Sequence, residues 1–174
     1  MLTLSRSAAI IGFVLLSGGI RAADLEIEVR NVKPRKGEVR AALFDNEQAF
    51  AAAVKIRAAL EQGQITSGVF TREGDFPREP VDTQVVPATG RTVTLQFNDL
   101  EPGEYAFGVY QDLNSDERLD ITLGLVSLEP WTLSNDAGKL DEDPRWQDAK
   151  FILPPEGRSM VVHLMEERRK DDAR

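Results

Sequence analysis

Short runs of alternating apolar and polar residues predict that this chain is mainly β. Leu25–Val29 alternate apolar with charged side chains, and Thr92–Phe97 repeat the period of two that is typical of a strand with one buried face. Val39–Phe44 form an apolar run after the turn-rich stretch Lys33–Gly37, so Leu25–Val29 and Val39–Phe44 are predicted to pair as a hairpin. Further strands are predicted at Phe107–Tyr110, Ala149–Leu153 and Met160–Met165.

One segment breaks this pattern and predicts a helix of three to four turns. Asp45 and Gln48 have the spacing of a capping box, and Gly63 marks an expected helix end. Between them, apolar residues follow at helical spacing: Phe50, Ala53, Val54 and Ala58. The next stretch, 66–87, contains several glycines and prolines and predicts an irregular surface segment.

A turn at Pro102 and Gly103 leads into a strand with Tyr105 near its start. This order resembles the tyrosine corner of Greek-key sandwiches, in which the phenol hydroxyl binds backbone upstream. The alternative is a plain turn followed by a core tyrosine. Five to eight short strands separated by turns, with one inserted short helix, predict a single β-sandwich domain.

The first residues of the chain predict an export signal. A basic start, Met1–Arg6, precedes the uncharged apolar run Ser7–Ile20, and Ala22 and Ala23 are small residues suited to a cleavage site. The run is shorter than the roughly 20 residues that span a bilayer. We therefore expect cleavage and no stable membrane insertion afterwards, with an uncleaved anchor as the alternative. The expected organisation is a signal peptide over 1–23, a β-sandwich domain over 24–165 and a charged tail over 166–174, in a periplasmic or extracellular protein.

Composition excludes several kinds of chemistry. The 174 residues include no cysteine and one histidine, so disulfides, thiolate nucleophiles and multi-histidine metal sites are excluded within one chain. That histidine, His163, is expected to be a partly exposed strand residue rather than a catalyst. Removing Arg6 and Arg21 with the leader takes the formal net charge from −8 to −10. Such a charge argues against nucleic acid and anionic membrane surfaces as partners.

An acidic loop after the strand ending at Tyr110 carries the clearest chemical pattern. Side chains with oxygen occupy positions 1, 3, 5 and 9 of a loop of the EF-hand type: Asp112, Asn114, Asp116 and Asp120. Ca²⁺ takes about six to eight oxygen ligands, and a curled loop turns alternate side chains toward one point. The carbonyl of Arg118 is the candidate ligand at position 7. The loop is therefore a candidate calcium site.

Two residues depart from that pattern. Position 6 is Glu117, where the sharp turn favours glycine, and position 12 is Leu123, so the bidentate glutamate is missing. Glu129 or Asp136 would have to supply the missing ligand, and the expected affinity is weak, roughly 10⁻⁴–10⁻³ M. The alternative is an Asx-turn loop whose carboxylates bind only backbone N–H groups.

Several motifs occur in order along the second half of the chain: Pro102–Ala106, Asp112–Asp120, Gly124-Leu125, Glu129, Ser134-Asn135 and Asp148–Phe151. Together they resemble an uncharacterised family of exported bacterial proteins, domain of unknown function 2141. The resemblance implies an immunoglobulin-like or transthyretin-like sandwich with no established activity. The family's loop acids fall on Asp112, Asn114, Asp116 and Asp120, its glutamate on Glu129, and its Ser-Asn pair on Ser134 and Asn135. Three residues differ from the family pattern: Glu117 replaces a glycine, Val126 a proline and Trp131 a tyrosine.

The sequence leaves two functions open. The first is a non-enzymatic module of the cell envelope, which binds a protein or glycan through the long loop Asp112–Asp148, ordered by Ca²⁺. The second is a hydrolase that acts on envelope polymers through carboxylates such as Asp116, Asp120 and Glu129. A pocket that holds one carboxylate of raised pKa beside an ionised one favours the hydrolase. We favour the binding module and assign no catalytic residue.

Overall fold

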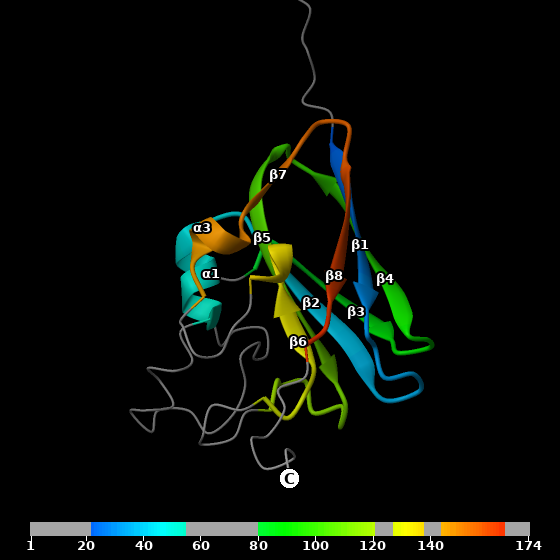
Figure 1. Cartoon of the computed structure of the whole chain (residues 1–174). Coiled ribbons are helices and arrows are strands. Elements are labelled where there is room, and N and C mark those ends of the chain that lie inside the picture. Colours follow the sequence, from blue (N-terminus) through cyan, green and yellow to red (C-terminus); the bar gives the residue numbers. More distant parts are fainter. Residues whose placement is uncertain (1–21, 55–79, 121–126, 138–143, 166–174) are drawn as a thin grey trace, which may run out of the picture.

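The computed structural model describes residues 22–54, 80–120, 127–137 and 144–165, and these form two facing β-sheets (Figure 1). The smaller sheet has the strand order β4-β1-β8. Its strands are β1 (Ala23–Arg30), β4 (Thr92–Leu100) and β8 (Arg158–His163). The prediction of a mainly β protein is confirmed.

The larger sheet has the order β3-β2-β5-β6, and β7 pairs with the start of β5. Its strands are β2 (Glu38–Phe44), β3 (Asp82–Pro87), β5 (Gly103–Asp112), β6 (Trp131–Leu133) and β7 (Phe151–Leu153). All the pairs between named strands are antiparallel except β1 with β8. Strand β3 lies within the segment predicted to be irregular, since its pairing with β2 outweighs a composition rich in turn residues.

The predicted hairpin between the first two strands is wrong. β1 pairs with β4 and β8, whereas β2 pairs with β3 and β5 in the other sheet. Both strands bury apolar side chains in the same core, including Ile27 of β1 and Leu43 of β2. The connection between them, residues 31–37, therefore crosses from one sheet to the other. Two strands bury apolar side chains in a shared core whether they face each other across it or lie side by side in one sheet, so the sequence pattern does not separate the two arrangements.

The larger sheet is buried on both faces along β5, β6 and the end of β2, which gives the domain three layers. One face meets the smaller sheet across a core that includes Phe97 and Phe107. The other is covered by α1 (Glu47–Val54) and α3 (Trp146–Ala149) in Figure 1. This second core contains large aromatic side chains: Phe44, Phe50, Tyr110, Trp131 and Trp146. The central strand β5 is consequently buried at each of its last eight residues.

The predicted helix exists at its start. α1 begins at Glu47, and its cap is Asn46, whose Oδ1 accepts from the Ala49 amide at 2.9 Å, one residue beyond the predicted Asp45 and Gln48 pair. The predicted end at Gly63 lies outside the described residues. The structure also has α3 and a 3₁₀ turn, η1 (Ser134–Asp136), where the sequence predicted no helix. No described helix is long and apolar enough to cross a membrane.

The tyrosine-corner hydrogen bond is present. The hydroxyl of Tyr105 donates to the carbonyl of Glu101 at 2.7 Å and closes the arch between β4 and β5. Tyr105 is buried, and burial is the main reason why its pKa is raised. The ring also lies 6.4 Å from that of Phe151 on β7, so the corner is joined to the core by packing as well as by the hydrogen bond.

Replacing Tyr105 by phenylalanine should lower the free energy of unfolding by about 1–2 kcal/mol, because it removes this hydrogen bond and leaves the Glu101 carbonyl without its donor. Urea unfolding followed by circular dichroism measures the change. The denaturant slope should not change, since the buried surface stays the same. A Tyr105→Phe protein as stable as the wild type would contradict a fastening role for this corner.

Candidate functional site

The acidic loop begins where β5 ends, at one end of the sandwich. Register places Asp112 opposite Glu38 and Tyr110 opposite Arg40, so the loop starts over strand β2. Leu119 of the loop is buried in the second core, which ties the loop to the larger sheet. The loop is therefore held at both of its ends.

The Asp112 carboxylate is buried and organises the first turn of the loop. Its Oδ1 accepts from the amides of Ser115 and Asp116 at 2.6 and 3.3 Å, and its Oδ2 accepts from the amide of Glu117 at 2.8 Å. Arg40 of β2 places its Nε 3.1 Å from the same Oδ2. Asp112 thus serves as the anchor of an Asx-turn loop.

Exposed Asp116 and half-buried Asp120 converge on one amide group. The Nδ2 of Asn114 donates to an oxygen of Asp116 and to one of Asp120, both at 3.1 Å. Asp116 also accepts from the Arg118 amide at 3.0 Å. Burial and the neighbouring Asp116 and Asp112 raise the pKa of Asp120. Two carboxylate oxygens therefore point at one place, which is occupied by a hydrogen-bond donor.

Glu129 closes the loop from the following segment. Its two oxygens accept from the amides of Leu113 at 2.6 Å and Asp120 at 3.1 Å, so one side chain joins both ends of the loop. Glu129 is only 4% exposed. This burial raises its pKa, and the raising effect exceeds the lowering effect of the two amide donors. The Asp120 carbonyl also accepts from the Leu128 amide at 2.9 Å.

Arg40 is a component of the site that the sequence analysis missed. Its guanidinium contacts three carboxylates: Glu38 at 3.0 Å, Asp112 at 3.1 Å and Glu117 at 3.6 Å. It supplies the loop with a positive charge from the neighbouring strand. One feature of the sequence could have drawn attention to it: Arg40 is the only charged residue within the predicted strand Val39–Phe44.

Glu117 has the backbone conformation that favours glycine. Its φ is +68°, and that of Ser115 is +61°. A residue with a Cβ pays about 1–2 kcal/mol for this left-handed conformation, which explains why a glycine was expected at position 6. The loop nevertheless keeps its shape, because the Glu117 amide is held by Asp112.

The Ser-Asn pair has a clear structural role. Ser134 is fully buried, and its Oγ donates to the Ala149 carbonyl at 2.7 Å and accepts from the Phe107 amide at 3.1 Å. The Nδ2 of Asn135 donates to three successive carbonyls at the end of α3, those of residues 148–150, at 3.0–3.2 Å. The pair fastens α3 to β5.

The remaining candidate ligand, Asp136, lies away from the loop. One of its oxygens accepts from the His163 amide at 3.1 Å, and the other is 3.5 Å from the His163 ring. His163 is about half exposed, as the sequence predicted for a partly exposed strand residue. Within the described part of the chain, no group of three or more acidic or histidine side chains is arranged to hold a metal ion.

Comparison with known proteins identifies a family. The model of a family described as an uncharacterized protein conserved in bacteria, DUF2141, matches residues 54–161. The match begins well before the motifs at Leu100–Phe151 and includes most of the segment 46–87, which carries none of the motifs on which the resemblance to this family rested. No curated protein and no solved structure matches the chain.

The positive φ of Glu117 predicts that a glycine variant at this position is more stable than an alanine variant. Glu117→Gly should be more stable than Glu117→Ala by roughly 1 kcal/mol, because both lose the contact with Arg40 and only alanine keeps a Cβ at positive φ. At ordinary helical positions the order is reversed. Urea unfolding of the two variants measures the difference. An alanine variant at least as stable as the glycine variant would contradict the left-handed conformation.

Proposed function

Because the chain belongs to this bacterial family of unknown function, DUF2141, we propose a role that rests on its own geometry, as a non-enzymatic binding or accessory module of the cell envelope. The observation that carries the proposal is that the two buried carboxylates bind backbone amides of the loop. Both oxygens of Asp112 and both of Glu129 accept backbone amides, so these carboxylates shape a loop. A fixed loop on a rigid sandwich is the usual arrangement of a binding surface.

Export to the periplasm or the outside of the cell is part of the proposal. It rests on the basic and apolar pattern of residues 1–23. β1 begins at Ala23, which is 2% exposed and pairs with Leu100. Cleavage after Ala22 would therefore keep β1 whole, whereas cleavage after Ala23 would remove a core residue.

We also propose that the sandwich is of the Greek-key kind, similar to immunoglobulin or transthyretin domains. Two facing sheets, the crossing between β1 and β2, and the Tyr105 corner support that assignment. The parallel pair β1–β8 and the helical layer are additions to such a sandwich.

Weak calcium binding is proposed for the same loop. The support is the pair of oxygens, one each from Asp116 and Asp120, that meet at the Asn114 amide. A Ca²⁺ ion at that point would be bound by Asp116 and Asp120 and would displace the amide nitrogen. Asp112 and Glu129 would act mainly by holding the loop, since amides already occupy their oxygens. With so few free ligands, the expected dissociation constant is roughly 10⁻⁴–10⁻³ M.

Millimolar Ca²⁺ should raise the melting temperature of the mature protein, because an ion that binds only the folded state stabilises it by mass action. The rise should disappear in Asp116→Asn/Asp120→Asn and persist in a control, Glu101→Gln/Glu156→Gln, which removes two charges outside the loop. Differential scanning calorimetry with Ca²⁺, Mg²⁺ or EDTA measures it. An equal shift in both double variants, or none in the wild type, would rule out this site.

The alternative function is a carboxylate-dependent hydrolase of envelope polymers. The observation in its favour is the raised pKa of Glu129 close to Asp112 and Asp120. A carboxyl group whose pKa is raised by its surroundings is what general acid catalysis uses. Against it, Glu129 is buried and bound at both oxygens, so a substrate would have to displace a backbone amide.

One experiment separates the two functions. The mature protein is incubated with a washed bacterial envelope fraction from which the phospholipid has been extracted, and both retained protein and released soluble sugars and peptides are measured. We expect retention without release, and at least a several-fold weaker retention of Asp116→Asn/Glu117→Gln than of the control Glu101→Gln/Glu156→Gln. Release of fragments that Asp120→Asn or Glu129→Gln abolishes would establish the hydrolase instead.

A further inference from the structure

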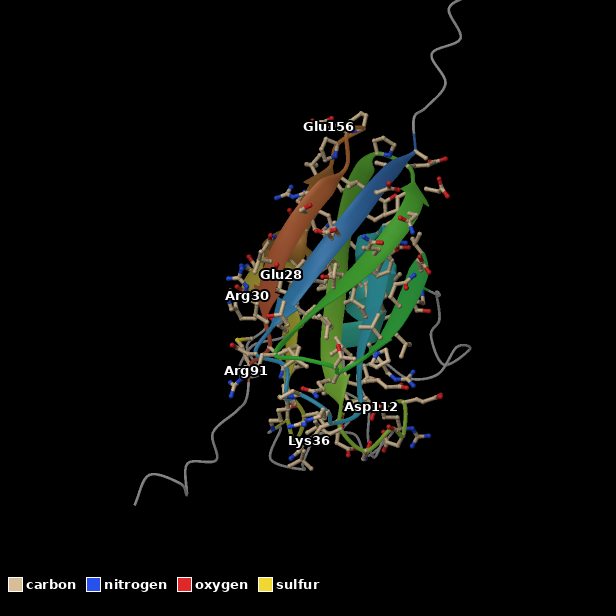
Figure 2. The ribbon with its side chains drawn as sticks, turned by 90° about the vertical axis from the view of Figure 1, so that its right-hand side faces the viewer. Glu28, Arg30, Lys36, Arg91, Asp112 and Glu156 are labelled. Carbon is tan, nitrogen blue, oxygen red and sulfur yellow. The ribbon has the colours of Figure 1, made fainter. Side chains whose placement is uncertain are left out.

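Three positive side chains without partners gather at one end of this acidic protein. Among the described residues, Arg35, Lys36 and Arg91 are exposed and have no carboxylate or ring contact. Arg35 and Lys36 lie on the crossing between β1 and β2, and Arg91 lies between β3 and β4. Figure 2 shows Lys36 and Arg91 at the end of the sandwich opposite to Glu156. We call these three residues the basic platform.

Arginine and lysine residues elsewhere in the described structure are engaged. Arg145 pairs with Asp148 at 2.7 Å and Lys150 with Glu104 at 2.9 Å. Arg158 lies over the Phe151 ring and donates to the Ile152 carbonyl. Near the platform, Arg30 pairs with Glu28, and Arg40 binds Glu38 and the acidic loop. The basic platform is therefore a local cluster of positive charge on a protein whose net charge is negative.

The two turns that carry the platform are joined by backbone hydrogen bonds. The Val32 amide donates to the Arg91 carbonyl at 3.1 Å, and the Arg35 amide donates to the Ala88 carbonyl at 2.6 Å. The Ala88 amide donates to the Gly37 carbonyl at 3.2 Å. These bonds fix one turn against the other, although the turns are more than fifty residues apart in the chain.

A buried glutamine holds the first turn from below. Gln111 of β5 is fully buried, and its side-chain amide nitrogen, Nε2, donates to the carbonyls of Lys33 and Lys36 at 2.8 and 2.6 Å. Its Oε1 accepts from the Lys33 amide at 2.8 Å. Gly37 has a φ of +58°, and a Cβ there would collide with the Asp112 carbonyl. The turn is thus built to one shape.

Arg35 itself is in a strained conformation. Its φ is +61°, a region that favours glycine or asparagine over an arginine. A cation kept at such a position, on a turn fixed by a buried glutamine, is presented to solvent at a conformational cost. Strain of this kind is typical of residues that contact a ligand.

We propose that the basic platform docks the domain on an anionic phospholipid surface. The argument is charge complementarity: three unpaired cations on two fixed turns match a surface dense in phosphate groups, which can supply a counter-charge to each. The net charge of the chain confines such binding to this end, since the other faces are repelled. The acidic loop borders the platform and limits the affinity, because Asp116 and Glu117 are exposed there.

The test is co-sedimentation of the mature protein with vesicles of phosphatidylglycerol and phosphatidylcholine, at low ionic strength and in EDTA. The wild type should bind these vesicles and not pure phosphatidylcholine. Arg35→Gln/Lys36→Gln/Arg91→Gln should lower the partition coefficient roughly 100-fold, at about fivefold for each basic residue. Asp116→Asn should raise it. Arg35→Gly should weaken binding about fivefold without lowering the melting temperature, since glycine relieves the strain.

A matched control separates the platform from net charge. Arg145→Gln/Lys150→Gln/Arg158→Gln removes the same three charges elsewhere and should change partitioning by less than about fivefold. An equal loss in both triple variants would overturn the proposal, as would equal binding to neutral vesicles. Inorganic phosphate that displaces the protein better than chloride of equal ionic strength would indicate a site for a single phosphate and would also overturn docking on a surface.

Discussion

The buried carboxylate of Asp112 is the interaction on which the functional end of the molecule depends. It accepts three loop amides and lies against the Arg40 guanidinium, so one side chain connects strand β5, strand β2 and the loop. Removing one partner of a buried charge pair commonly costs about 3–5 kcal/mol, because the other charge is left uncompensated. Arg40 of β2 and Asp112 of β5 therefore depend on each other, because each compensates the charge of the other.

The motif residues on which the resemblance to the family rested share a common kind of task. Asp112, Glu129, Ser134 and Asn135 bind backbone groups and fix the course of segments that have little regular structure. Long connections lose conformational freedom on folding without gaining the backbone ladder hydrogen bonds of a strand, and side-chain hydrogen bonds to the backbone offset part of that loss. A motif rich in Asp, Asn and Ser thus describes a scaffold for loops as readily as a metal site.

Much of the fold followed from the sequence, and the failures have physical causes. Strands β1 and β4 were predicted correctly because one face of each is buried and the other is exposed to solvent. Their sequences therefore alternate between apolar and polar residues. The partner of β1 was mispredicted, since alternation reports burial and carries no information on which strand lies beside it. Arg40 was overlooked because its significance depends on a residue 72 positions later in the chain, Asp112. Gln111 was overlooked for the same reason, as its carbonyl partners lie on another strand connection.

The parallel pairing of β1 with β8 has a consequence for how the chain reaches its final shape. The first described strand has the last described strand as a neighbour, from Leu25 with Arg158 to Arg30 with His163. Contacts between such distant segments slow folding, because a long loop must close before they form. A chain that emerges gradually from the ribosome keeps one edge of β1 unpaired until its end is made. If the protein is exported as proposed, late pairing of β1 favours translocation of the chain before it folds.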